Sequence, residues 1–404
     1  MVRKTNLKQL VTHEMLKDRF DLFFSAGFRP FFLAAAILAL SFVPAWLLAL
    51  FSGSGFFAEN LTVEWHMHEM LFGYFSAVVT GFLLTAIPNW TQRQPWRGYP
   101  LMLLFILWLA GRVAMTGTPG VAGSIIDSAF LVVITGVAFF EVWQAGNRRN
   151  FVVVGVVGLY AVFNILFHLE RMGQVNTEIA VRGGIATLVM LVSLIGGRII
   201  PNFSRNWLSS LQRPAPIPVT GSFDKISLLV LAVALILWLC APAEKLTGVF
   251  LLFVAVLQMV RFLRWRFWLI RGNALLLVLH VAYAWLPVGA LLLGVNLLAP
   301  VQELLSGQSA GIHALTAGLM TMMTLSVMTR AILGHTGRPL KAGFLGTMIF
   351  ILIFLAAFSR VAASFEGLSY QPLLISAAIL WSLSFLLFLC RFGVLVFAES
   401  KSTE

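Results

Sequence analysis

Apolar segments of bilayer length recur along the whole chain, and short polar segments separate them. A hydrocarbon core about 30 Å thick needs roughly 20 apolar residues in a helix, and about half that number in a strand. The pattern therefore predicts an all-α polytopic membrane protein with about twelve transmembrane helices in one bundle. The predicted spans cover residues 31–51, 70–88, 99–115, 121–143, 151–169, 179–200, 224–242, 247–269, 272–297, 310–332, 342–364 and 370–396.

Composition agrees with this pattern, because 59% of the residues are hydrophobic and only 11% are charged, which no soluble core of this size requires. We expect a cytoplasmic N-terminal segment (1–30), a membrane domain (31–396) and a cytoplasmic C-terminal tail (397–404). The first 27 residues are polar and charged, so we expect no cleaved signal peptide. Cys240 and Cys390 both lie inside apolar segments, which argues against a disulfide framework.

The charges predict how the bundle lies in the membrane. Lys and Arg are frequent before the first span and in every second loop after it, whereas the intervening loops are poor in them and carry Glu. Positive charge favours the cytoplasmic side, so both termini are predicted to be cytoplasmic. The net charge of +12 then reflects membrane orientation, and we expect membrane lipid but no nucleic acid as a partner.

Four of the seven histidines fall into one layer on the opposite, outer side. His66 and His68 lie at the outer mouth of the second span, His168 lies at the outer end of the fifth, and His313 lies about one turn into the tenth. His280 lies deeper, in the ninth span. Ionisable residues inside a membrane are usually functional, and histidine commonly binds iron, copper and zinc. The layer predicts a metal site; the alternative is a set of histidines that pack and form hydrogen bonds.

The spacing of His66 and His68 limits how they can bind metal. Two residues apart on a regular helix, they point about 200° away from each other. They can share one metal only if His66 lies outside the regular helix; otherwise they serve two centres. Glu69 could orient a ligand histidine, or simply complement the helix dipole. Asn164 and Asp127 are polar groups predicted in the same layer.

Four arginines are predicted near the outer ends of spans, against the orientation rule. We expect them to have anionic partners, which could be haem propionates, acidic side chains or lipid phosphate. A stripe of small residues on the second span, Gly73, Ala77 and Gly81, allows close helix packing and could equally admit a flat macrocycle. The four arginines are Arg112, Arg171, Arg182 and Arg360.

A second group of polar residues is predicted on the cytoplasmic side: Arg198, Arg330, His335 and Arg338. These four could form an anion site. A positively charged loop with helix caps is the favoured interpretation. The nearby methionines Met320, Met322, Met323 and Met328 are predicted to pack in the core.

Four segments together resemble the NnrS family of bacterial membrane proteins, over most of the predicted spans. They are WHMHEMLFGYFSAVVTGFLLTAIPNWT, NILFHL, LHVAYAWLP and HALTAGLMTMMTLSVMTRAILGHTGRPL. The resemblance implies a twelve-helix inner-membrane protein that contains haem and copper and is linked to the response to nitric oxide and nitrosative stress. It does not specify a reaction. The histidines in matching positions are His66, His68, His168, His280, His313 and His335.

We therefore expect a haem- and copper-binding protein that binds or turns over nitric oxide. If the protein is an enzyme, the expected reaction is nitric oxide reduction, which requires an electron donor that the sequence does not identify. The alternative functions are sequestration or sensing of nitric oxide, and transport of a metal or anion. For haem, His68 with His313 or His168 are the expected ligands, and the outer arginines would bind the propionates. His66 is the expected copper ligand, and His280 could serve a second centre.

Overall fold

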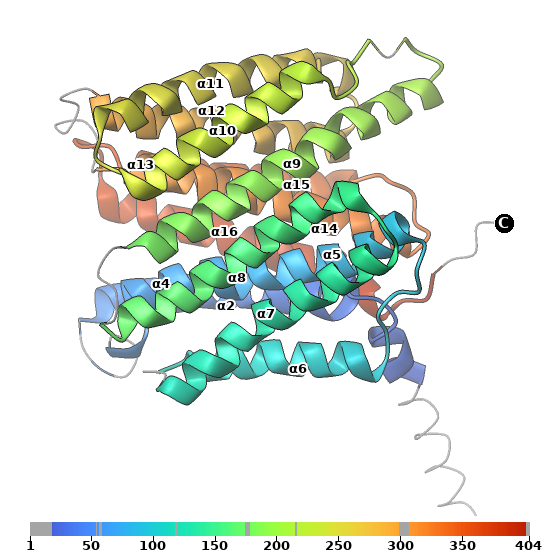
Figure 1. The fold of residues 1–404 in the computed structure, drawn as a ribbon, viewed down its shortest axis with the longest axis horizontal. Coiled ribbons are helices and arrows are strands. Elements are labelled where there is room, and N and C mark those ends of the chain that lie inside the picture. Colours follow the sequence, from blue (N-terminus) through green and yellow to red (C-terminus); the bar gives the residue numbers. More distant parts are fainter. Residues whose placement is uncertain are drawn as a thin grey trace, which may run out of the picture.

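The computed structural model describes residues 18–400 except 54, 56–58, 118–119, 174–177, 215 and 299–306. This part of the chain forms a single bundle of helices without a β-strand (Figure 1). Residues 1–17, which include His13, and 401–404 lie outside it, as does Glu303. The helices are Phe28–Ser52 (α2), Val63–His68 (α4), Glu69–Tyr74 (η1), Phe75–Thr91 (α5), Tyr99–Ala114 (α6), Val121–Gln144 (α7), Arg148–Asn150 (η2), Phe151–Arg171 (α8), Ile179–Ser210 (α9), Ser222–Cys240 (α10), Lys245–Arg264 (α11), Phe267–Ile270 (η3), Ala274–Leu298 (α12), Ser309–His313 (α13), Ala314–Thr321 (η5), Met322–His335 (α14), Gly343–Ala362 (α15), Tyr370–Arg391 (α16) and Gly393–Phe397 (η6).

Eleven helical segments of the described chain are long and apolar enough to cross a membrane, and α6 is a shorter apolar helix of 16 residues. In two of the eleven, α- and π-helices join end to end as continuous spans, Val63–Thr91 and Ser309–His335. Each predicted range overlaps one of these helices. The protein is therefore an all-α, multi-pass membrane protein, as predicted.

Several predicted boundaries are wrong: the second span begins at Val63 and not at 70, and the eighth ends at Arg264 and not at 269. Two others involve proline. The first span begins at Phe28, before Pro30, because a proline in the first turn of a helix removes no helical hydrogen bond. The sixth span does not end at Pro201, because α9 continues through this proline to Ser210. A proline inside a membrane helix is tolerated where neighbouring groups compensate for the lost hydrogen bond.

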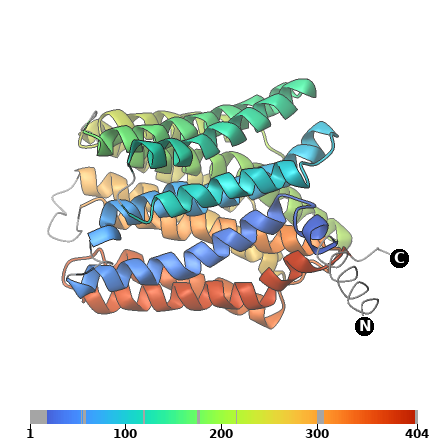
Figure 2. The same cartoon turned by 90° about the horizontal axis from the view of Figure 1, so that it is seen from below.

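Both ends of the described chain lie at one end of the bundle. Arg29, at the start of α2, donates hydrogen bonds from Nη1 to the carbonyl oxygens of Val396 (2.5 Å) and Ala398 (3.0 Å). Figure 2 shows α2 and α16 side by side along their lengths, and the two helices are in contact. An even number of crossings is needed to bring both ends to the same side, which agrees with α6 as the twelfth crossing.

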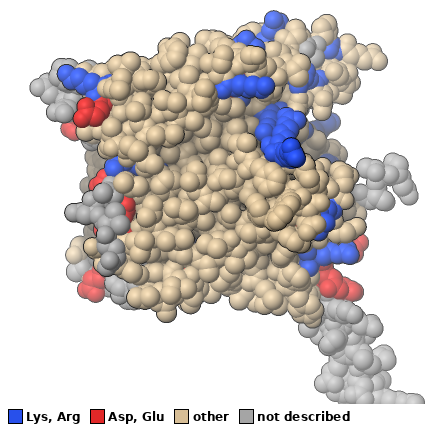
Figure 3. Space-filling view, in the orientation of Figure 1, with Lys and Arg blue, Asp and Glu red and all other residues tan. Residues whose placement is uncertain are grey.

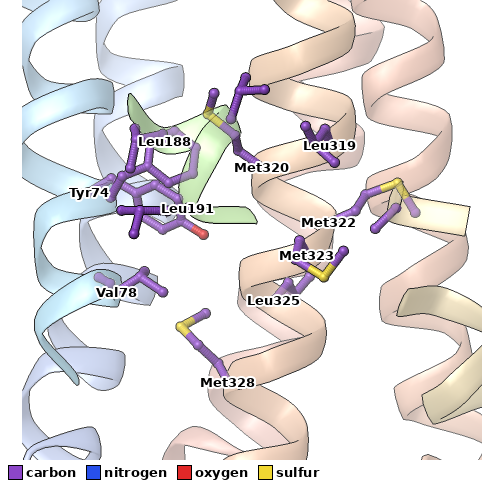
Figure 4. Packing of buried hydrophobic residues seen from close by; sticks show 14 of the residues in the cluster. Tyr74, Val78, Leu188, Leu191, Leu319, Met320, Met322, Met323, Leu325 and Met328 are labelled. Carbon is purple, nitrogen blue, oxygen red and sulfur yellow. The ribbon is translucent and has the colours of Figure 1, made fainter. Parts of the chain in front are cut away.

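The segments Val63–Thr91, α12 and Ser309–His335 lie inside the bundle, because 67–72% of their most apolar stretches is buried. The core between them is rich in methionine, as Figure 4 shows for Met320, Met322, Met323 and Met328. These four side chains are at most 4% exposed, so the prediction that they pack in the core is confirmed. Gly81 contributes by close packing, since a Cβ atom there would lie 2.6 Å from the Phe32 ring.

Most basic and most acidic side chains on the surface lie at opposite ends of the helices. Figure 3 shows Lys and Arg gathered at the right-hand end, whereas several Asp and Glu residues lie at the left-hand end. The surface between the ends carries many exposed large apolar side chains, among them Leu48, Val113 and Phe344. Such a surface suits a lipid environment. We refer below to the arginine-rich end and the acidic end.

Candidate metal-binding sites

The segment that carries His66 and His68 is a regular α-helix followed directly by a π-helix. The α4 helix begins after Thr62, whose hydroxyl accepts a hydrogen bond from the Trp65 backbone N–H (3.2 Å), and it ends at His68. Since α4 is regular, the two histidines point to opposite sides. His66 stacks on Trp46 with ring centres 4.0 Å apart, whereas His68 is fully buried on the other side. The two histidines therefore belong to two separate sites.

A π-helix follows the histidines in both joined spans. The first, η1, begins at Glu69 directly after His68, and the second, η5, begins at Ala314 directly after His313. The wider turn of η1 makes backbone carbonyl oxygens available as acceptors for side chains of other helices. Tyr160 donates a hydrogen bond to Leu71 O, and Trp108 Nε1 donates one to Gly73 O (3.1 Å). Short π-helical turns occur frequently at functional sites. Hydrophobic spacing gave no indication of them.

Six buried polar residues from four helical segments meet on the side of His68, and we call them the buried polar cluster. His68 lies 3.0 Å from Glu69 (Nδ1 to Oε1) and 3.1 Å from Asp127 (Nε2 to Oδ2). His168 Nε2 lies 2.9 Å from the same Asp127 oxygen. All members are at most 5% exposed: His68, Glu69, Arg112, Asp127, Asn164 and His168.

The charges of the buried polar cluster balance one another, which offsets the cost of removing them from water. Arg112 lies between the two carboxylates, with Nη1 2.5 Å from Glu69 Oε1 and Nη2 in contact with Asp127 Oδ1. His68 has a carboxylate oxygen beside each ring nitrogen, so a doubly protonated ring would donate to both carboxylates. One guanidinium and one such imidazolium would together neutralise the two carboxylates.

Part of the buried polar cluster has the donors of a metal site. One nitrogen each of His68 and His168 and one carboxylate oxygen of Asp127 lie within 4.8 Å of one another. Two imidazoles and a carboxylate suit copper(II), zinc or iron. Glu69 on His68 Nδ1 would fix that ring with Nε2 toward a metal, as outer carboxylates do in metal sites. His168 Nδ1 is buried without a partner in the described chain, so it can carry the ring proton when Nε2 binds metal.

A cavity of about 480 Å³ on the other side of α4 contains His66, His313 and Arg360, and we call it the histidine pocket. Its walls are mostly apolar and aromatic and come from α2, η1, α9, η5, α15 and α16, including Trp46 and Trp381. This volume lies within the range of small-molecule and cofactor sites, about 300–1,000 Å³.

The two histidines of this pocket differ in how they are held. His313 Nδ1 lies 2.8 Å from the Ser309 carbonyl oxygen one turn earlier, so Nδ1 donates and Nε2 is left as an acceptor. This tautomer is the one that binds a metal through Nε2. His66 is half-buried and has a ring contact with Trp46 but no hydrogen-bond partner among the described residues. His313 is therefore the better oriented ligand.

The other predicted site residues lie elsewhere. Of the four outer arginines, Arg360 alone lines the histidine pocket, where it donates to Ser364 Oγ (3.2 Å). Arg112 belongs to the buried polar cluster, Arg171 is exposed, and Arg182 pairs with Glu178 at 3.2 Å. Acidic side chains, one of the three predicted kinds of partner, are thus the partners of Arg112 and Arg182.

His280 lies in neither site. It is buried within α12, with Nδ1 3.0 Å from the Leu276 carbonyl oxygen, and its Nε2 has no partner in the described chain. Its ring neighbours are Phe262 and Trp265.

The predicted cytoplasmic group is partly brought together. Arg198, Arg330 and His335 line one cavity at the arginine-rich end, where His335 also stacks on Phe28. Arg338 does not line that cavity; it donates to the Thr336 carbonyl oxygen (3.2 Å).

The model of one protein family, described as NnrS protein, matches residues 22–399 of the chain. This range contains every residue of the buried polar cluster and of the histidine pocket, and it confirms the resemblance seen in the sequence motifs. A search of curated proteins found no match to the chain.

Proposed function

This chain belongs to the NnrS family, which links it to the nitric oxide response, and from that premise we propose that it binds haem and copper and captures nitric oxide. One observation carries the proposal: a large apolar cavity in the membrane domain contains a histidine whose Nε2 is free to bind iron. That histidine is His313, and the cavity is the histidine pocket.

The residues of the histidine pocket fit a haem. His313 would bind the iron through Nε2, and His66, which lines the same cavity without an orienting hydrogen bond, would be the weaker ligand or the neighbour of a bound gas. Arg360 would bind a propionate, because a guanidinium pairs well with carboxylate. The aromatic and aliphatic walls would cover the macrocycle. This assignment replaces the expected pairing of His68 with His313, since His68 faces the buried polar cluster.

A haem iron supplies a coordination position at which a diatomic gas can bind. The chain's own contribution is to bring the gas there and exclude competing ligands. Nitric oxide is small and apolar, so it can reach the pocket through the lipid and needs no polar channel. The apolar walls disfavour charged competitors such as nitrite, because burying an unpaired charge is costly.

Copper would be held by His68, His168 and Asp127 in the buried polar cluster. The support is the set of converging donors, the carboxylate of Glu69 that orients His68, and the partnerless Nδ1 of His168. His66, the copper ligand expected from the sequence, faces the other cavity.

We propose that the protein lies in the bacterial inner membrane with its arginine-rich end in the cytoplasm, as the positive-inside rule requires. The histidine pocket would then lie on the periplasmic side. Sequestration or sensing requires only binding, whereas reduction of nitric oxide also requires an electron donor.

An optical spectrum of the purified protein tests the proposal. We expect a Soret band that shifts when nitric oxide is added. Steady consumption of the gas under a reductant would identify an enzyme, and a shift without consumption would identify sequestration or sensing. A protein purified after growth with excess haem that shows no Soret band would overturn the proposal and favour the transport alternative.

A further inference from the structure

A cavity of about 390 Å³ at the arginine-rich end lies between α5, α9 and α14, and we call it the basic pocket. Arg198, Arg330 and His335 line it, together with Asn89 and Thr85. No acidic residue of the described chain lines this cavity. The histidine pocket and the buried polar cluster lie toward the other end of the same spans, so the basic pocket belongs to neither candidate metal site.

The two arginines of the basic pocket are half-buried, and neither pairs with a carboxylate of the described chain. Among the buried arginines, Arg112 and Arg261 pair with carboxylates, and Arg29 donates to two backbone carbonyl oxygens. Arg198 instead donates to a neutral amide, Asn150 Oδ1, at 3.2 Å. The guanidinium of Arg330 lies 4.0 Å from the centre of the Phe203 ring and has no carboxylate partner among the described residues. The pocket therefore holds two positive charges that the described chain does not neutralise.

The wall of the basic pocket away from these charges is apolar and continues into a narrow groove. Phe82, Ile195, Ile199 and Val327 line both the pocket and the groove, which extends toward Leu188. Figure 4 shows Val78, Leu188, Leu191, Met320 and Met323, which line the groove, on its three helical segments. Several groove side chains, including Phe82 and Ile195, are only half-buried, so the groove is open at the surface of the bundle.

The length of the groove matches one leaflet of a bilayer. Along α9 it extends from Ile199 to Leu188, a rise of about 16 Å at 1.5 Å per residue. Half of a hydrocarbon core is about 15 Å thick. A ligand with its anionic group at the arginines and an acyl chain in the groove would span that leaflet.

We propose that the basic pocket and the apolar groove bind one acidic glycerophospholipid. Its phosphate would lie between Arg198 and Arg330, and one acyl chain would lie along α5, α9 and α14. Arginine forms strong charge-assisted hydrogen bonds with phosphate, and basic pockets between membrane helices bind anionic head groups. A soluble anion would use the arginines but would leave the groove without an occupant.

Native mass spectrometry of the protein released from phosphatidylcholine nanodiscs that contain a minor fraction of phosphatidylglycerol tests this proposal. We expect the wild type to retain one phosphatidylglycerol. Because a hydrogen bond to a charged group contributes about 1.5–3 kcal/mol, Arg330→Gln or Arg198→Gln should each lower retention about tenfold or more. Arg213→Gln is the matched control, since Arg213 is exposed after α9 and outside the basic pocket. Equal retention by the wild type and both pocket variants would overturn the proposal.

Two further experiments distinguish binding of a lipid from binding of a soluble phosphate. Val327→Phe should narrow the groove and weaken retention while both arginines remain. Excess inorganic phosphate should not displace the lipid at concentrations where a second acidic phospholipid does. If phosphate displaces the lipid equally well and Val327→Phe has no effect, the site recognises a soluble anion and the lipid proposal is wrong. Variants that do not fold are identified by their elution in size exclusion, and the remaining arginine variant then decides the result.

Discussion

Replacing Arg112 by leucine tests whether the buried polar cluster stabilises the fold through charge balance. The substitution keeps a long apolar side chain but leaves Glu69 and Asp127 without the guanidinium that contacts both. The three groups are at most 5% exposed, so water cannot replace the lost contacts. Removing one partner of a buried ion pair costs about 3–5 kcal/mol, a large part of the stability of a typical protein at about 5–15 kcal/mol. We expect a loss of stability in that range.

The assay is equilibrium unfolding by sodium dodecyl sulfate in mixed micelles, followed by far-ultraviolet circular dichroism. Arg171→Leu is the matched control at the same end of the bundle. Arg171 is exposed, so this substitution should change the stability by no more than about 0.5 kcal/mol. Adding Glu69→Gln to Arg112→Leu removes one uncompensated charge and should recover part of the stability. An Arg112→Leu loss no larger than the control's would refute the charge-balance argument.

Three other predictions concern packing, copper and orientation. Gly73→Ala should destabilise the protein by about 1–3 kcal/mol, because a Cβ atom would lie 2.5 Å from Arg112 Nη1. Gly136→Ala is the control and should leave the stability unchanged, because a Cβ atom there meets no atom within 4 Å. Equal melting temperatures of the two variants would contradict the prediction. His168→Ala should remove most of the copper measured by elemental analysis and retain the haem spectrum; unchanged copper would exclude the proposed copper site. A cysteine in place of Glu59 should be labelled from the periplasm, whereas a cysteine in place of Arg148 should be labelled only after lysis. The reverse pattern would invert the proposed orientation.

The sequence was sufficient for the architecture because span length and loop charge are set by the membrane itself. The regular helix that separates His66 from His68 was one of two alternatives left open, and the structure selects it. Packing of the small residues at Gly73 and Gly81 against side chains of other helices agrees with the close-packing interpretation. Each of these features depends on a single helix or on its depth in the membrane, and the order of apolar and polar residues along the sequence is enough to predict both.

The pairing of side chains between helices could not be predicted, because it depends on how each helix is rotated about its axis. Depth alone put His68 and His313 in one layer, yet they face different sites, and η1 and η5 change the direction of the residues that follow. Asp127 stood out as an acid within an apolar helix, but its contacts with His68 and His168 require the packing of α7 against its neighbours. The partner of Arg112 was likewise open among three kinds of anion.

The haem content of His313→Ala is the most direct test of the histidine pocket. The variant should be purified beside His335→Ala, which removes a histidine at the arginine-rich end that stacks on Phe28. Haem is measured by the Soret band and by pyridine haemochrome absorbance per folded protein. We predict that His313→Ala loses its haem or shows a changed Soret band, and that His335→Ala keeps the wild-type spectrum. An unchanged spectrum in well-folded His313→Ala would contradict the central claim, as would loss of haem in well-folded His335→Ala.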